Sequence, residues 1–170
     1  MADEPRRIYW DACVLLSYFN DVSARIPILE ELFKQSRAEE VELLTSSISR
    51  VEVSFVQSEK DDGELDPGAE AAIEGFWAPG SPIKTVEFYD LIADDARALI
   101  RRGIKQGWGN LKPMDAIHLA TAQRMEVAEM HSYDDRVKKW SGHLGFPITD
   151  AVTDQGVLGP ETSSSEAATS

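Results

Sequence analysis

The stretch Arg7-Ile8-Tyr9-Trp10-Asp11 joins a short apolar run to a single carboxylate near the start of the chain. A run of this length that ends at a polar residue is typical of a buried strand followed by a turn. Three more such runs and one weaker run follow, at residues 42–45, 83–86, 127–131 and 146–149. We therefore expect four to five short strands.

Helical patterns separate the predicted strands. Apolar residues recur at helical spacing in residues 28–33, 48–56 and 91–100. We expect Ser47 to cap the second of these helices, Gly103 to end the third and Pro113 to begin a fourth. Because strand and helix alternate, the sheet should be mostly parallel and covered by helices on both faces, an α/β fold.

The length and composition fit one domain with a packed core. The 170 residues are 42% hydrophobic and 28% charged. We place the domain in residues 1–150, with an acidic surface loop near residues 60–68, and we expect the acidic, Ser-rich residues 151–170 to end in disorder. The single cysteine, the lack of a secretory signal and the lack of a long apolar run predict a cytoplasmic protein without a membrane segment.

The net charge of −13 argues against nucleic-acid binding, since phosphate contacts need clustered lysines and arginines. The acidic residues are unevenly placed, however: residues 60–74 hold six of them against one lysine. A basic group that could contact phosphate consists of Arg97, Arg101, Arg102, Lys105 and Lys112, and a second consists of Arg136, Lys138 and Lys139. The alternative is that both groups are solvated helix faces.

Four carboxylates fall near the predicted ends of strands or the starts of helices. Asp11 follows the first strand, Asp134 follows the fourth, Glu52 lies near the start of the helix after the second, and Asp115 lies in the helix that Pro113 begins. Parallel sheets bind ligands at the carboxyl ends of their strands, so these side chains should converge. An all-oxygen cluster of like charges suits Mg²⁺ or Mn²⁺, which can activate water against a phosphodiester. The pattern thus indicates a metal-dependent nuclease.

The segments that carry these carboxylates resemble the four motifs of PIN-domain ribonucleases, and VapC-type toxins are the most similar subgroup. The segments read IYWDACVL at residues 8–15, SRVEV at 49–53, KPMDAIHLATA at 112–122 and SYDDR at 132–136. The resemblance covers about residues 8–150. It implies a three-layer α/β/α fold and a Mg²⁺- or Mn²⁺-dependent endoribonuclease, the toxin of a toxin–antitoxin pair.

The resemblance also assigns roles to residues and partners. It implies that Asp11, Asp115 and Asp134 bind the metal and that Glu52 completes the acidic pocket. It further implies a tRNA, rRNA or mRNA substrate, a small antitoxin protein and a homodimer. On this basis we assign RNA contacts to four of the basic residues, Arg101, Arg102, Lys105 and Lys112.

Two positions depart from the family pattern. Ala12 stands where the family usually has Thr or Ser, so a hydroxyl beside the first carboxylate is missing. Ser132 keeps the hydroxyl that a Thr usually supplies before the fourth carboxylate. We assign the site role to Asp134 because of its spacing from Ser132, and we expect Asp135 to support it by capping a short helix at residues 136–140.

Other interpretations remain open from the sequence. The chain could be a PIN-fold interaction module without catalysis, or a housekeeping RNA-processing nuclease. A phosphatase that forms a phosphoaspartate is disfavoured because Asp-x-Asp is missing after the first strand. We interpret His118 as a packed helix residue rather than a base, Cys13 as a small buried hydrophobe, and Trp108 as a packing residue with base stacking as the alternative.

Overall fold

A single parallel sheet organises the computed structural model, which describes residues 4–153. The strand order is β3-β2-β1-β4-β5, and every neighbouring pair is parallel. The strands are β1 Arg6–Trp10, β2 Val41–Ser46, β3 Ile83–Val86, β4 Glu129–His131 and β5 Ile148–Thr149. This confirms the predicted sheet, although β4 begins two residues later than expected.

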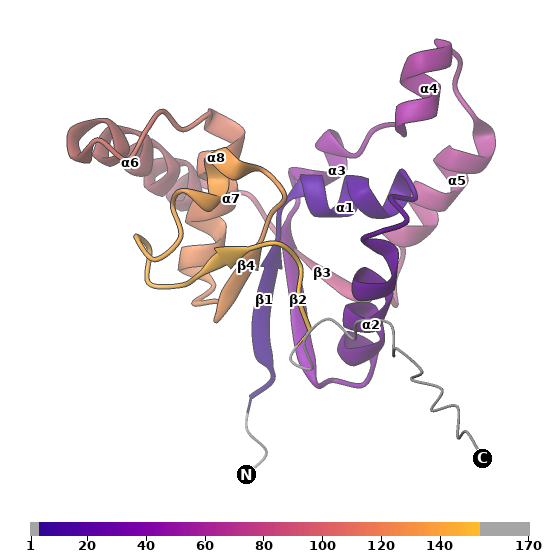
Figure 1. The fold of residues 1–170 in the computed structure, drawn as a ribbon, viewed down its shortest axis with the longest axis horizontal. Coiled ribbons are helices and arrows are strands. Elements are labelled where there is room, and N and C mark those ends of the chain that lie inside the picture. The colour runs from indigo at the N-terminus through magenta and orange to yellow at the C-terminus, as the bar shows by residue number, and fades with distance from the viewer. Residues whose placement is uncertain (1–3, 154–170) are drawn as a thin grey trace, which may run out of the picture.

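Helices cover both faces of the sheet. They are α1 Ala12–Phe19, α2 Ile26–Arg37, α3 Ser49–Glu52, α4 Gln57–Asp62, α5 Pro67–Phe76, α6 Asp90–Gln106, α7 Pro113–Arg124 and α8 Asp135–Lys138. Figure 1 shows α1, α2 and α5 on one side of the strands and α6, α7 and α8 on the other. None of the helices described is long and apolar enough to cross a membrane.

Successive residues of β1 supply two separate cores. Side chains alternate between the faces of a strand, so Ile8 and Trp10 pack with Leu29 of α2, whereas Tyr9 packs with Leu119 of α7. All five side chains are fully buried. The two cores on opposite faces of one sheet confirm the three-layer α/β/α fold.

The helix expected at residues 48–56 is wrong in extent. Only the single turn of α3 forms there, and Val51, which should have been buried, is 72% exposed. Ser47 does not cap it, because its hydroxyl accepts a hydrogen bond from the backbone N–H of Phe88 at 3.0 Å. This contact ties the end of β3 to the segment that carries Glu52.

The prediction that Gly103 ends the helix is wrong. The helix continues to Gln106 and ends at Gly107, which adopts the left-handed conformation with φ 71°. A Cβ on Gly103 would lie 2.6 Å from two ring carbons of Trp140, so glycine is needed there for packing. Pro113 begins α7 as predicted.

The acidic segment is mostly helical rather than a loop. α4 ends at Asp62, Gly63 turns the chain with φ 69°, and Asp66 caps α5 by accepting from the N–H of Gly68 at 3.0 Å. The buried carboxylate of Glu59 accepts from the backbone N–H of Val56, just before α4, and from that of Asp66, just before α5. The loop therefore shrinks to residues 63–66. Most of the tail assigned to residues 151–170 lies outside the described residues.

Candidate active site

Asp11 lies at the carboxyl end of β1 and caps α1. Its Oδ1 accepts from the backbone N–H of Cys13 at 3.2 Å, from that of Val14 at 3.4 Å, and from the Cys13 thiol at 2.7 Å. The residue is only 5% exposed. Burial raises the pKa of Asp11, while nearby His118 and the hydrogen bonds act in the opposite direction.

Cys13 joins the ends of β1 and β4. Its sulfur lies 2.7 Å from Asp11 Oδ1 and 3.5 Å from the hydroxyl of Ser132, and it accepts from the N–H of Tyr133 at 3.2 Å. Burial and the charge of Asp11 raise the pKa of the thiol to about 12, so it stays protonated and donates at neutral pH. Residue 13 thus supplies a donor beside Asp11 although Ala12 has no hydroxyl. The sequence interpretation of Cys13 as a packing residue missed this contact.

Asp134 follows β4 and is held by an arginine two residues later. Arg136 makes a two-point contact, with Nε 3.1 Å from Oδ1 and Nη2 2.7 Å from Oδ2. This contact lowers the pKa of Asp134. Buried Ser132 also contacts this segment, since its hydroxyl accepts from the N–H of Asp134 at 3.1 Å.

The expected helix cap at Asp135 is wrong. Asp134 itself caps α8, accepting from the N–H of Arg136 at 2.9 Å. The side chain of Asp135 is 90% exposed and lies 3.1 Å from Lys138. The first free N–H groups of α8 are reached from the residue before the helix, and Asp134 occupies that position.

Asp115 connects the carboxylates electrostatically. It lies half-buried in the first turn of α7. Burial raises the pKa of Asp115 most, and the charges of Asp134 and Asp11 raise it further, while Arg136 lowers it. The charge of Asp115 thus interacts with those of Asp11 and Asp134, and we call these three aspartates the acidic cluster.

Glu52 reaches the same edge of the sheet through a buried histidine. His118 Nε2 lies 2.7 Å from Glu52 Oε2, and Nδ1 lies 2.7 Å from the hydroxyl of Tyr9. That hydroxyl accepts from the N–H of Ser46 at 3.0 Å. Burial raises the pKa of Tyr9 well above its ordinary value, so the phenol stays protonated and donates a hydrogen bond to Nδ1.

The direction of this hydrogen-bond chain follows from its donors. Because Nδ1 accepts from Tyr9, the N–H at Nε2 of His118 donates a hydrogen bond to Glu52. His118 is packed, as predicted, and is only 2% exposed. Its contact with Glu52 could not be predicted, because the two residues are 66 positions apart.

The donor set suits a hard divalent cation in its chemistry. Three aspartates supply only oxygen ligands, and the repulsion that raises the pKa of Asp115 is what a bound cation would relieve. Within residues 4–153, however, no group of three or more His, Cys, Asp and Glu side chains is already arranged around one point. Asp11 and Asp134 are instead turned toward protein donors.

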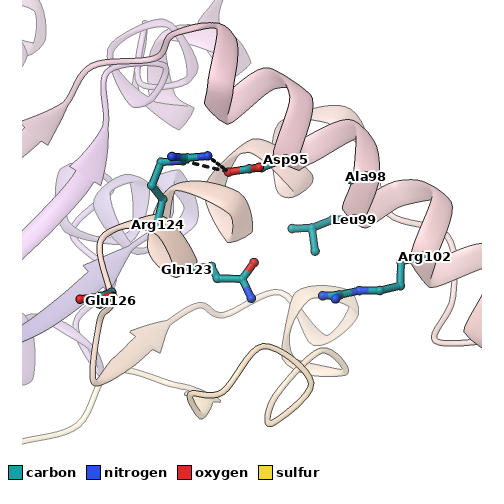
Figure 2. Close-up of a pocket in the computed structure, with 7 residues that line it drawn as sticks. All are labelled: Asp95, Ala98, Leu99, Arg102, Gln123, Arg124 and Glu126. Carbon is teal, nitrogen blue, oxygen red and sulfur yellow. Dashed lines mark hydrogen bonds and ion pairs between the residues drawn. The ribbon is translucent and has the colours of Figure 1, made fainter.

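The basic residues assigned to RNA do not share one face. Lys112 precedes α7, and its charge lowers the pKa of Asp134, so it lies near the acidic cluster. Arg101 lines one surface pocket, whereas Arg102 lines another together with Asp95 and Gln123, as Figure 2 shows. Lys105 is exposed near the end of α6.

Trp108 is occupied by contacts within the protein. Its ring stacks on His143 at a centroid distance of 4.2 Å and an interplanar angle of 10°, and it meets the edge of Trp140 at 5.4 Å. The guanidinium of Arg102 lies 5.5 Å from the same ring. These contacts favour the packing role over base stacking.

Comparison with known families gives a match over most of the chain. The PIN domain family matches residues 8–142. The chain belongs to the PIN domain family. Among curated protein sequences, none matches it.

Solved structures with the same fold as this PIN domain include several VapC and VapBC proteins. DNA-bound VapBC from Salmonella typhimurium is 16% identical, with a TM-score of 0.62, covering 86% of this chain and 99% of the other. VapC20 from Mycobacterium tuberculosis, described as a sarcin–ricin loop cleaving toxin, is 14% identical, with a TM-score of 0.59 and coverages of 82% and 95%. VapBC2 from Rickettsia felis, bound to a promoter DNA fragment, is 12% identical, with a TM-score of 0.56 and coverages of 84% and 97%.

Proposed function

We propose that this PIN domain is a Mg²⁺- or Mn²⁺-dependent endoribonuclease of the VapC type, the toxin of a toxin–antitoxin pair. The observation that carries the proposal is the acidic cluster of Asp11, Asp115 and Asp134 at the carboxyl edge of the sheet, with Glu52 beside it. Membership of the PIN domain family supports a nuclease. The neighbour VapC20, described as cleaving the sarcin–ricin loop, supports RNA as the substrate class.

In this proposal the three aspartates of the acidic cluster would hold the cation. When bound, a divalent cation supplies charge stabilisation for the phosphodiester and lowers the pKa of a coordinated water. His118 orients the Glu52 carboxylate by donating to it at 2.7 Å, so Glu52 can accept a proton from the attacking water. Cys13 restrains Asp11 by donating from its protonated thiol.

The contact of Arg136 with Asp134 shows that a guanidinium group can compete with a metal ion for the acidic cluster. Its guanidinium forms a two-point contact with Asp134 and neutralises part of the cluster's charge. A cation that binds Asp134 has to displace this contact. An arginine supplied by a partner would fit the same carboxylates.

We therefore include a cognate antitoxin that inserts a basic side chain into this site, and a homodimer in the cytoplasm. The fold neighbours described as VapBC complexes support the antitoxin. We also propose that Lys112 contacts the RNA, since it lies near the acidic cluster. Of the other three basic residues assigned from the sequence, Arg101 and Lys105 are treated as weaker contacts, since they are four residues apart on one face of α6. Arg102 lines a different pocket and is left out of the proposed RNA contacts.

A second function is favoured by one observation. Arg136 already occupies Asp134, and no three-ligand arrangement exists among the described side chains. A PIN-fold interaction module that has lost catalysis would show the same features. Direct Mn²⁺ binding separates the two functions, because a degenerate site would show no binding that depends on Asp115.

The proposed function is tested by cleavage of a labelled tRNA pool and of total RNA. The wild type and Asp115→Asn would be compared in Mn²⁺, in Mg²⁺ and in EDTA, with Asp95→Asn as a matched control. Asp95 pairs with Arg124, away from the acidic cluster. We expect cutting that needs metal, is lost in Asp115→Asn and persists in Asp95→Asn. Equal cutting by Asp115→Asn in Mn²⁺ would contradict the proposal.

A further inference from the structure

An apolar pocket of about 270 Å³ lies between α6 and the start of α7. Phe88, Ala96, Ile100, Pro113 and Ile117 contribute apolar surface to it. Pro113 and Ile117 are four residues apart and share one face of α7, whereas the intervening Asp115 projects from another face. The pocket therefore lies beside the acidic cluster but is separate from it.

Two arginines give this pocket a positive rim. Arg97 and Arg101 are one turn apart on α6, both are exposed, and both line the pocket. In the part of the chain that the structure describes, neither forms an ion pair or a hydrogen bond with another side chain. Two unpaired guanidinium groups on a chain of net charge −13 give this surface the opposite charge from the whole.

The pocket is placed along the same sheet edge as the acidic cluster. Phe88 follows β3, and its N–H donates to Ser47, which lies between β2 and α3. Along that edge the order of elements is β3 with Phe88, β2 with Glu52, β1 with Asp11 and β4 with Asp134. A nucleic-acid strand that follows this edge would run from the acidic cluster, past Glu52, to the pocket.

We propose that this pocket holds one nucleobase of a single-stranded RNA, next to the phosphodiester that is cleaved, and that Arg97 and Arg101 contact the flanking phosphates. The inference rests on the proposed function. Pockets for drug-sized ligands begin at about 300 Å³. The volume of this pocket is slightly smaller and suits a single ring system such as a nucleobase. Proteins bind unpaired bases on apolar and aromatic surfaces, and guanidinium groups match phosphate in geometry and charge.

The test measures binding without cleavage, in EDTA, with the full chain. Fluorescein-labelled hexaribonucleotides of A, C, G and U would be compared by anisotropy with a hexamer of abasic ribose phosphate. Ala93→Phe fills the pocket without a change of charge, and Arg101→Gln removes one rim cation. Arg102→Gln is the matched control, because Arg102 is the next residue on the helix and faces the other pocket, seen in Figure 2.

We expect at least one base to bind more tightly than the abasic hexamer. Ala93→Phe should weaken that binding about 10-fold and remove the preference over the abasic hexamer. Arg101→Gln should weaken both kinds of hexamer about 3-fold, and Arg102→Gln should leave both unchanged. Since Arg101 is exposed, its variant keeps the test valid if Ala93→Phe fails to fold.

Two results would overturn the inference. One is equal binding of base and abasic hexamers by the wild type, and the other is wild-type affinity in both Ala93→Phe and Arg101→Gln. A dimer that becomes a monomer in Ala93→Phe, with RNA binding unchanged, would show that a second copy fills the pocket instead.

The same series separates this inference from the proposed function. Asp115→Asn should lose cleavage in Mn²⁺ but keep its base preference in EDTA. Metal-dependent cleavage without any base preference contradicts the pocket assignment alone. A base preference in a wild type that does not cut RNA contradicts the nuclease alone.

Discussion

Tyr9 and Trp10 are neighbours on β1, and each donates to the Nδ1 of a buried histidine on its own face of the sheet. Tyr9 contacts His118, which donates to Glu52 at 2.7 Å. Trp10 contacts His131 at 3.0 Å, and His131 Nε2 lies 2.8 Å from a glutamate of its own strand, Glu129. The two regions therefore have almost the same hydrogen-bond chemistry.

Their positions differ, and so do the roles that we assign to them. Glu52 lies on α3 at the carboxyl edge of the sheet, beside the acidic cluster. Glu129 begins β4 and also pairs with Arg6 at 3.6 Å. A buried histidine–glutamate pair is therefore not itself evidence of function. Its place at the edge where a parallel sheet binds ligands is the informative feature.

Neutralising the two glutamates in turn should separate the two regions most clearly. We expect Glu52→Gln to lower the rate of RNA cleavage about 100-fold, because the residue that accepts the proton is lost, while its folding stability is retained. Glu129→Gln should cleave at nearly the wild-type rate. Cleavage of labelled tRNA and thermal melting, measured on both variants, would check this. Similar losses of cleavage in both would remove the distinction between the two regions.

Substitution of the two histidines, His118 and His131, should affect cleavage in the same way as substitution of the glutamates, but with a smaller loss of rate. We expect His118→Gln to reduce cleavage about 10-fold, since Glu52 remains but loses its fixed donor. His131→Gln should mainly destabilise the fold, by about 2 kcal/mol, because His131 is fully buried with partners on both nitrogens. Cleavage rates at saturating RNA and urea unfolding measure the two effects. A His131→Gln variant that is stable but inactive would contradict the assignment.

The sequence predicted most of the framework on which this comparison rests. Strand ends and a first-turn proline are local signals, and they predict that Asp11, Asp115 and Asp134 lie at one edge of the sheet. In the structure the charges of Asp11 and Asp134 raise the pKa of Asp115. The contacts of His118 and Cys13 could not be predicted. The contacts with Tyr9, Glu52 and Tyr133 join residues more than 60 positions apart. The thiol contact with Asp11 is local, but packing at an apolar position explains a cysteine equally well.

The errors in local structure have physical causes of a related kind. Val51 fits a helical apolar pattern, yet the chain leaves α3 after one turn and exposes it. Gly103 looks like a helix end, but it remains inside α6 because Trp140 packs against its missing side chain. In both cases the extent of the helix depends on whether a tertiary contact is present. The spacing of apolar residues in the sequence does not show such contacts.

A smaller effect concerns how the acidic cluster is neutralised. We expect Arg136→Gln to raise the affinity for Mn²⁺ about 5-fold, because the two-point contact on Asp134 no longer competes with the cation. Lys138→Gln is the control, since Lys138 is a nearby cation that contacts Asp135 and Asp150 instead. Calorimetric titration of both variants would measure the change. Weaker Mn²⁺ binding in Arg136→Gln would show that the arginine supports the metal site.

The smallest effect is on the pH dependence of stability, where Asp115 and Glu129 should have opposite signs. The folded-state pKa of Asp115 is raised, so its ionisation costs stability as the pH rises above about 4. Asp115→Asn should thus melt about 2 °C higher than wild type at pH 7 and equally at pH 3.

Glu129 has a lowered pKa, first through its hydrogen bond with His131, so its contribution is present above about pH 4.3 and is lost as the pH falls through the folded-state value. Glu129→Gln should therefore melt lower than wild type at pH 7, and the difference should shrink in acid. Thermal melts from pH 3 to 7 measure both variants. A lower melting temperature for Asp115→Asn at pH 7 would contradict the account of repulsion in the acidic cluster.

We infer that the acidic cluster holds a divalent cation. The most direct measurement is Mn²⁺ binding by electron paramagnetic resonance, in wild type, Asp115→Asn and the control Asp95→Asn. The account predicts saturable binding in the wild type and in Asp95→Asn, with loss of at least about 10-fold in affinity in Asp115→Asn. Equal binding in all three proteins, or none in the wild type, would contradict it.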